Sequence, residues 1–181
     1  MIDNAARKLE VKLFLGPPGS GKSYASKYLA NEQATAEGRI IVAHDPMGEW
    51  YGRADYTYPT VWYWGPLLNS PNPVENFAAG SCHVIDEADM VLPKAAGQWT
   101  AARDLLNYGR HRKLLVYLAC RRPAALHNDA LAFATEVWCF KSSLPRDLKV
   151  YEEWFGFSRE QILALPEYHA LVWPSGEVRK V

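Results

Sequence analysis

The sequence has no excess of charge of either sign. Its 20 lysine and arginine residues balance 20 aspartate and glutamate residues, which leaves a formal net charge of zero. A chain with this balance is not drawn to nucleic acid by its overall charge, so any contact with DNA or RNA has to come from a local basic patch.

Cysteines and long apolar runs are also scarce. The three cysteines, Cys82, Cys120 and Cys139, have no metal-ligand spacing, which favours buried free thiols in a reducing compartment over a disulfide framework or a zinc site. No apolar run is long enough to span a bilayer, and the first residues do not form a signal peptide. We therefore expect a soluble intracellular protein without a membrane span of its own.

The sequence does contain enough apolar material for a core. Hydrophobic residues make up 49% of the 181 positions, which excludes a disordered tail and suits a single α/β domain over residues 1–181. No internal repeat and no low-complexity tract is visible in the sequence.

The most informative stretch is an apolar run at 11–15 followed by the letters GPPGSGKS. It fits G-x-x-x-x-G-K-[ST], the phosphate-binding loop of P-loop proteins. Its glycines let backbone N–H groups turn toward phosphate oxygens, and the helix after it adds its positive dipole end. Lys22 would reach the β- and γ-phosphates as a catalytic residue, and the Ser23 hydroxyl would bind Mg²⁺. The expected ATP-binding residues of this loop are Gly16, Pro17, Pro18, Gly19, Ser20, Gly21, Lys22 and Ser23.

Strands and helices alternate along the chain. Apolar runs and turn residues predict strands over 9–15, 39–44, 61–64, 82–86, 114–119 and 136–140. Similar signals predict helices over 22–36, 98–109, 124–131, 146–154 and 158–164, and a terminal hairpin of 168–173 and 178–181. This order predicts an α/β fold with a mainly parallel central sheet flanked by helices and followed by a C-terminal β-hairpin.

Polar residues follow four of the predicted strands. They are the phosphate loop, Asp45, the pair Asp86 and Glu87, and the run 120–122. Because ligands of parallel sheets bind at the carboxyl ends of the strands, we expect these groups to share one site.

Asp86 and Glu87 end a strand as a Walker B motif does. Asp86 would hold the Mg²⁺ shell through water, and Glu87 would orient and polarise the attacking water. An acidic first turn of the next helix is the alternative, since carboxylates favour helix N-termini. With a phosphate loop in the same chain, we favour the catalytic interpretation.

A cationic stretch extends from residue 103 to residue 122. Three roles are open for its members. They would stabilise transition-state charge on a neighbouring subunit's nucleotide, or contact the backbone of a nucleic acid. The third is a solvent-exposed helix C-terminus without a functional role, since cations favour helix C-termini. We favour a functional role for the cluster because two of the arginines follow an apolar strand. The cations are Arg103, Arg110, His111, Arg112, Lys113, Arg121 and Arg122.

Five segments together resemble the HerA/FtsK superfamily of RecA-like P-loop motor ATPases. More narrowly, the chain is similar to the genome-packaging ATPases of tailless, membrane-containing double-stranded DNA phages. The segments are the phosphate loop, DPMGEW at 45–50, VIDEA at 84–88, GRHR at 109–112 and ACRRP at 119–123. One departure concerns the sensor position, where Arg121 replaces the family's glutamine and would sense the γ-phosphate as a cation.

The resemblance implies a motor that hydrolyses ATP with Mg²⁺ and packages double-stranded DNA into a preformed capsid. It implies a homo-oligomeric ring, expected to be a hexamer, in which Arg110 acts in trans ahead of Arg103 or Arg112. It also implies a place in the host cytoplasm or at the virion vertex, beside capsid or membrane-associated viral proteins. Asp45 and Glu49 carry over to the nucleotide site, with a strand-capping turn as the alternative. The aromatic segment 50–65 is either a pore loop or ordinary packing.

Three other functions stay open. A filamentous-phage assembly ATPase of the zonular-occludens-toxin type shares the motifs but usually carries a membrane span. A small-molecule kinase would transfer phosphate to an acceptor, but the sequence shows no clear lid with paired arginines. A nucleotide-binding structural subunit of a capsid vertex would hold a ring without turnover, and the intact residues Lys22, Ser23, Asp86 and Glu87 argue against it.

Overall fold

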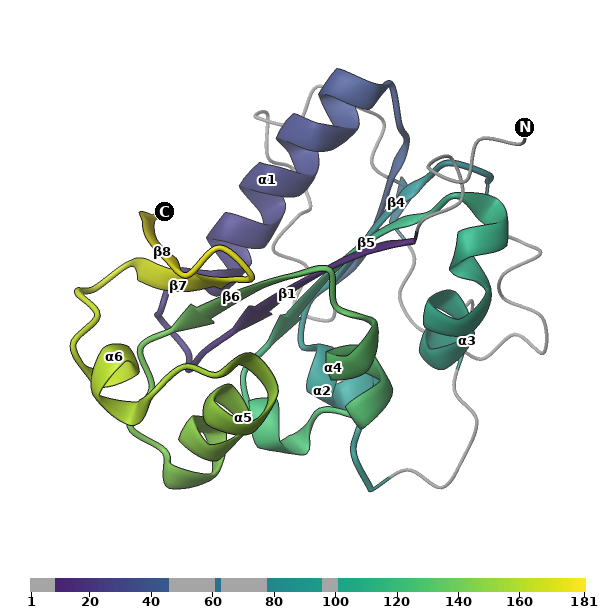
Figure 1. The fold of residues 1–181 in the computed structure, drawn as a ribbon. Helices are drawn as coiled ribbons and strands as arrows, with labels where there is room; N and C mark the ends of the chain where they lie inside the picture. Colours follow the sequence, from purple (N-terminus) through teal and green to yellow (C-terminus); the bar gives the residue numbers. More distant parts are fainter. Residues whose placement is uncertain (1–8, 46–60, 63–77, 96–100) are drawn as a thin grey trace, which may run out of the picture.

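The structure, a computed structural model, describes residues 9–45, 61–62, 78–95 and 101–181. In these residues one 8-stranded sheet has the order β3-β2-β4-β5-β1-β6-β7-β8 (Figure 1). The strands are β1 (Glu10–Leu15), β2 (Ile41–His44), β3 (Val61–Trp62), β4 (Cys82–Ile85), β5 (Leu115–Cys120), β6 (Glu136–Phe140), β7 (His169–Trp173) and β8 (Glu177–Lys180). The first six strands of this spatial order, from β3 across to β6, pair in parallel with their neighbours. Strands β7 and β8 then pair antiparallel at the β6 side of the sheet. The mainly parallel sheet and the terminal hairpin predicted from the sequence are confirmed.

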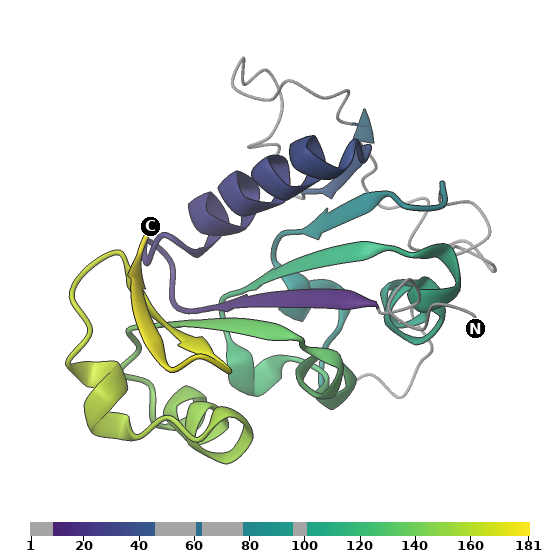
Figure 2. The same cartoon turned by 45° about the horizontal axis from the view of Figure 1, so that its top comes forward.

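Helices cover both faces of the sheet. Helix α1 (Lys22–Glu37) lies on one face, and the other described α-helices lie across the opposite face (Figures 1 and 2). These others are α2 (Ala88–Val91), α3 (Ala101–Tyr108), α4 (Asn128–Phe133), α5 (Pro145–Phe155) and α6 (Arg159–Leu163), with 3-10 turns η3 (Gly109–Arg112) and η4 (Pro123–Ala125). No helix in the described part of the chain combines the length and apolar character needed to cross a membrane.

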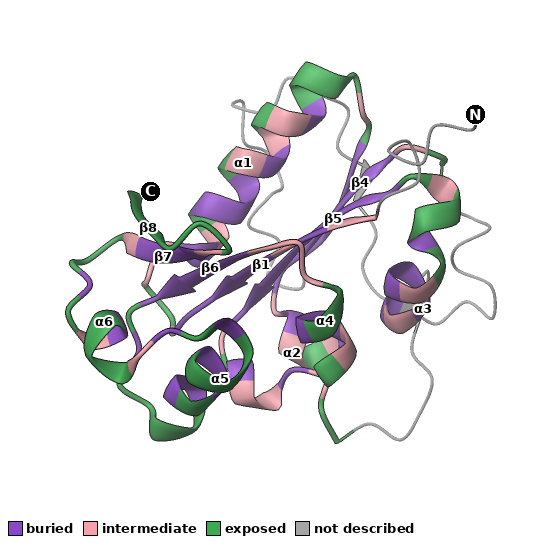
Figure 3. Cartoon of the chain, viewed as in Figure 1, coloured by how far each residue is buried: buried purple, intermediate pink, exposed green. Residues whose placement is uncertain are grey.

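The core consists of two apolar clusters, one on each face of the sheet. Alternate residues of β5 point to opposite faces of the sheet and belong to different clusters. Tyr117 and Ala119 pack on the face covered by α1, and Val116 and Leu118 pack on the opposite face. Because β5 is central and covered on both faces, all six of its residues are buried (Figure 3). This explains why its sequence is a continuous apolar run without alternation.

Several predicted boundaries need correction. The helix predicted over 124–131 is two elements, η4 and then α4, because the His127 side chain caps α4 by accepting a hydrogen bond from the Asp129 N–H (3.2 Å). The short helix α2 after the acidic pair was not predicted. Strand β2 begins only at Ile41, because Gly38 ends α1 in a left-handed conformation (φ 64°). Glu49 and most of the aromatic segment 50–65 lie outside the described residues.

Candidate active site

The loop between β1 and α1 has the conformation that the phosphate-loop motif requires. Gly19 and Gly21 have φ values of 78° and 95°, in the left-handed region that favours glycine. A Cβ atom on Gly16 would lie 2.7 Å from Phe140 Cβ, so this position also needs glycine. The Gly16 N–H donates to the Cys120 carbonyl (3.1 Å), which ties the loop to the end of β5. The loop therefore leads straight into a helix start, the arrangement that binds phosphate.

The polar groups expected at the strand ends meet at one edge of the sheet. The Ser23 hydroxyl donates to Asp86 Oδ1 at 3.2 Å. Lys27 Nζ lies 3.7 Å from Asp86 Oδ2 and 4.0 Å from Asp45 Oδ2. Arg121, at the end of β5, forms an ion pair with Glu87, at the end of β4. Four segments that are far apart in the sequence thus converge beside Lys22, itself a buried residue.

The acidic pair is held rigidly after β4. Glu87 adopts a left-handed conformation (φ 52°), which costs about 1 kcal/mol or more for a residue other than glycine. Its backbone N–H donates to Asp86 Oδ1 (3.0 Å), and the Arg121 N–H donates to Asp89 Oδ1 (3.2 Å). The two acidic residues and the end of β5 are therefore fixed relative to one another, and strain of this kind gathers at functional sites.

Burial makes both carboxyl groups more basic than usual. Burial raises the pKa of Asp86, although Lys27, the Glu87 N–H and the Ser23 hydroxyl act in the opposite direction. Burial also raises the pKa of Glu87, against the opposing effect of Arg121. A carboxylate with a raised pKa accepts a proton more readily, which suits Glu87 to polarising a water molecule.

Lys27 is a site residue that the sequence analysis missed. Its side chain is 5% exposed and lies between the carboxylates of Asp45 and Asp86. It follows Ser23 by one helical turn, so the two side chains share a face of α1. The signal in the sequence was the spacing, because Lys27 lies three and seven residues before the apolar residues Ala30 and Ala34, on the same face of the helix.

Ser23 and Asp86 fit Mg²⁺. A hydroxyl and a carboxylate are the hard oxygen donors that this ion prefers, and it usually takes only one or two protein ligands beside phosphate and water. In the described residues, no group of three or more histidine, cysteine, aspartate or glutamate side chains could hold a metal by itself. Magnesium at Ser23 and Asp86 would therefore depend on the phosphates of a bound nucleotide.

The cationic stretch is divided between the two edges of the sheet. Arg121 and Arg122 follow β5 at the edge that holds the phosphate loop, whereas Arg110, in η3, precedes β5 at the opposite edge. A strand of this length separates them by roughly 20 Å. Arg103 is paired within the chain with Asp129 (2.7 Å). The exposed Arg110 therefore lies far from the phosphate loop of its own chain.

Solved structures with this fold include two that hold an ATP analogue. The genome-packaging NTPase B204 of Sulfolobus turreted icosahedral virus 2, in complex with AMPPCP, matches with a TM-score of 0.73 and 19% identity over 96% of each chain. The N-terminal domain of zonular occludens toxin from Neisseria meningitidis matches with a TM-score of 0.53 and 20% identity, over 75% of this chain and 78% of that one. The pCW3 conjugation coupling protein TcpA with ATPγS matches with a TM-score of 0.63 and 18% identity, over 92% and 57%.

These likenesses confirm the P-loop NTPase fold that the motifs predicted. No protein-family model and no curated protein sequence matches the chain.

Proposed function

We propose that the chain is an ATP-driven motor that moves a double-stranded DNA genome into a preformed viral capsid. The observation that carries the proposal is the joint placement of the phosphate loop, the Ser23 to Asp86 contact and the Glu87 to Arg121 ion pair in one site. The likeness to the genome-packaging NTPase of Sulfolobus turreted icosahedral virus 2 extends over nearly the whole of both chains and supports the packaging role.

The residues of this site suit hydrolysis of ATP. The loop N–H groups and Lys22 would bind the triphosphate, and Mg²⁺ at Ser23 and Asp86 would supply positive charge to the β- and γ-phosphates. Glu87 would orient a water molecule and take its proton. The water oxygen then bonds to the γ-phosphorus, and the bond from that phosphorus to the oxygen of departing ADP breaks.

Arg121 would act as a sensor. The γ-phosphate is an anion that competes with the Glu87 carboxylate for the same guanidinium group. Nucleotide binding would therefore weaken the Arg121 to Glu87 ion pair and leave the carboxylate available to water.

We also infer that the chain works as a homo-oligomeric ring, which we expect to be a hexamer. Arg110 lies at the edge of the sheet opposite the phosphate loop, so a contribution to catalysis has to be made on a neighbouring subunit's nucleotide. The monomer should then be nearly inactive.

The direct test is steady-state ATP hydrolysis with and without double-stranded DNA. We expect DNA to stimulate turnover, and the stimulation to fall as salt rises, because contacts to the DNA backbone displace counterions. A rate of ATP hydrolysis that double-stranded DNA does not change would contradict the proposed motor function. ATP binding without any turnover would favour a nucleotide-binding structural subunit instead.

Replacement of Arg121 by glutamine should alter the pH dependence of turnover. Arg121 lowers the pKa of Glu87, so the Arg121→Gln variant should have a higher Glu87 pKa and an acidic limb shifted to higher pH. Loss of one charge-assisted contact should also reduce kcat by roughly tenfold near neutral pH. The measurement is a pH profile of kcat/KM, because this ratio reports the pKa values of the free enzyme, in which the ion pair is intact. Arg146→Gln is the control because Arg146 is exposed on α5. An unchanged acidic limb would show that Arg121 does not act on Glu87.

A further inference from the structure

We propose that the pocket beside the phosphate loop binds an adenine base. In this assignment the Tyr168 ring stacks on the base, and the Glu167 carboxylate accepts a hydrogen bond from its exocyclic amine. The assignment rests on the proposed ATPase function and identifies which residues would bind the base of the nucleotide.

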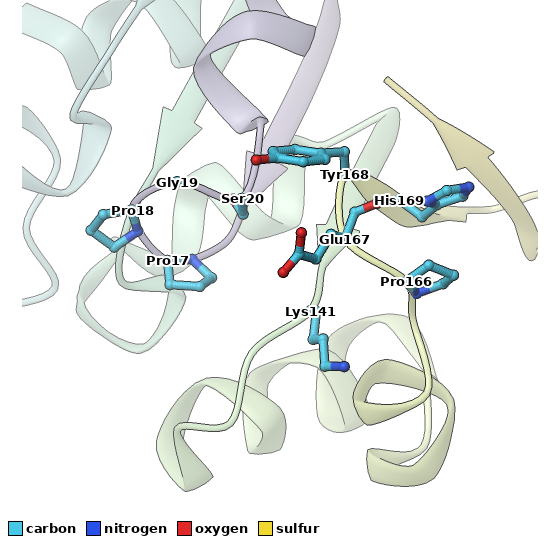
Figure 4. A pocket seen from close by; sticks show the side chains of 9 residues that line it. All are labelled: Pro17, Pro18, Gly19, Ser20, Lys141, Pro166, Glu167, Tyr168 and His169. Carbon is cyan, nitrogen blue, oxygen red and sulfur yellow. Dashed lines mark hydrogen bonds between the residues drawn. The ribbon is translucent and has the colours of Figure 1, made fainter.

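The pocket is formed by three segments that are remote in the sequence. Its walls are residues 17–20 of the phosphate loop, residues 166–169 at the start of β7, and Lys141 after β6 (Figure 4). Its volume is about 210 Å³. Sites for a whole drug-sized ligand measure about 300–1,000 Å³, so this pocket suits one ring system of a nucleotide whose phosphates lie in the adjoining loop.

Tyr168 is placed where a base attached to those phosphates would need a platform. A Cβ atom on Gly21, the residue before α1, would lie 3.4 Å from Tyr168 Cδ1, so the ring stands against the start of the helix. The side chain is nevertheless 53% exposed, which leaves ring surface available for stacking. The tyrosine backbone is left-handed (φ 57°), and its carbonyl accepts a hydrogen bond from the Val181 N–H (3.0 Å). The platform is therefore fixed by the C-terminal hairpin.

Glu167 supplies a hydrogen-bond acceptor in the same pocket. Its carboxylate points toward the phosphate loop (Figure 4), and no residue in the described part of the chain pairs with it. Adenine carries an amine donor at ring position 6. The Glu167 carboxylate can accept a hydrogen bond from this amine, so the pocket supplies a polar partner for the base beside the tyrosine ring.

A second pocket nearby is less suitable for the base. It has a volume of about 270 Å³ and lies along α1, between the exposed residues Tyr24 and Tyr28 and the strand residues Trp138 and Lys180. Among the described residues that line it, none belongs to the phosphate loop before α1 and none has a carboxylate side chain. It offers aromatic surface without a carboxylate side chain to accept a hydrogen bond from the base amine.

The test is isothermal titration of the full chain with ATP and inorganic tripolyphosphate. Stacking of a base on an aromatic ring is worth enough that Tyr168→Ala should weaken ATP binding by about 5- to 150-fold. Binding of tripolyphosphate, which has no base, should stay within about twofold. Tyr168→Phe keeps the ring and should retain ATP affinity. Glu167→Ala removes the acceptor and should weaken ATP binding by about 3- to 10-fold, without weakening tripolyphosphate binding.

Tyr28→Ala is the matched control, because Tyr28 is 55% exposed and lies in the second pocket. We expect it to leave both affinities unchanged. ATP binding that is lost in Tyr28→Ala but kept in Tyr168→Ala would overturn the assignment and place the base in the second pocket. Equal weakening of ATP and tripolyphosphate by Tyr168→Ala would also overturn it, because the defect would then lie in the phosphate loop. A wild-type chain that binds neither ligand would instead refute the nucleotide site itself.

Discussion

Glu87→Gln is expected to abolish ATP turnover while leaving ATP bound. The variant keeps the size of the side chain and the left-handed backbone but removes the group that takes the proton of water. Loss of a general base typically reduces the rate by about 100- to 10,000-fold, so we expect kcat to fall by at least 100-fold. The measurement is phosphate release under saturating ATP and Mg²⁺, with the ATP dissociation constant determined on the same sample.

Glu153→Gln is the matched control for this variant. Glu153 is exposed on α5, and in the described part of the chain it forms only an i, i+4 pair with Lys149, so its substitution should leave kcat unchanged. If Glu87→Gln retains turnover within tenfold of the wild type, another group activates the water. A parallel loss of ATP binding would point to a disturbed site instead of a missing base.

Lys27→Met is expected to destabilise the fold by about 3–5 kcal/mol. Lys27 is buried, and its removal leaves the buried carboxylates of Asp45 and Asp86 without the cation that lies between them. Breaking a buried ion pair from one side carries a cost of this size, because the remaining charge stays out of water. Chemical denaturation at neutral pH measures the difference in unfolding free energy.

Two accompanying measurements separate this electrostatic cause from a packing defect. Mg²⁺ should raise the melting temperature of Lys27→Met more than that of the wild type, because a divalent cation replaces the missing ammonium. The exposed control Lys149→Met should change stability by less than about 0.5 kcal/mol. A loss for Lys27→Met as small as that of the control would show that Lys27 does not balance the two acids.

The stability defect of Lys27→Met should also shrink at acidic pH. Burial raises the pKa of Asp86 above its ordinary value of 3.8, and the opposing effect of Lys27 is lost in the variant. A carboxyl group whose pKa is higher in the folded state than in the unfolded state lowers the unfolding free energy at pH values above the folded-state pKa. The cost is relieved as pH falls through it, because protonation removes the buried charge. Denaturation at several pH values below neutrality tests this sign, and a defect that grows with acidification would contradict it.

Local patterns in the sequence were sufficient to predict the architecture and the main segments of the candidate site. The phosphate loop is recognisable because its glycines are needed locally, Gly19 and Gly21 for positive φ and Gly16 for close packing. The continuous apolar run in β5 predicted a parallel strand with helices on both faces of the sheet, and all six of its residues are buried. The convergence of the loop with Asp45, Asp86 and Arg121 followed from a general rule, because parallel strands present their carboxyl ends at one edge.

The contacts between side chains of remote segments became visible only in the folded chain. Lys27 lies between two acidic side chains, and Arg121 forms an ion pair with Glu87. Arg110 lies at the edge of the sheet opposite the phosphate loop, although Arg110 and Arg121 belong to one basic stretch of the sequence. The fold also brings Tyr168 to Gly21, because β7 joins the sheet beside β6 and β6 beside β1. Hydrophobic periodicity and turn residues predict the secondary structure and the buried face of each segment separately. Contacts between remote segments depend on strand order, which local patterns do not encode.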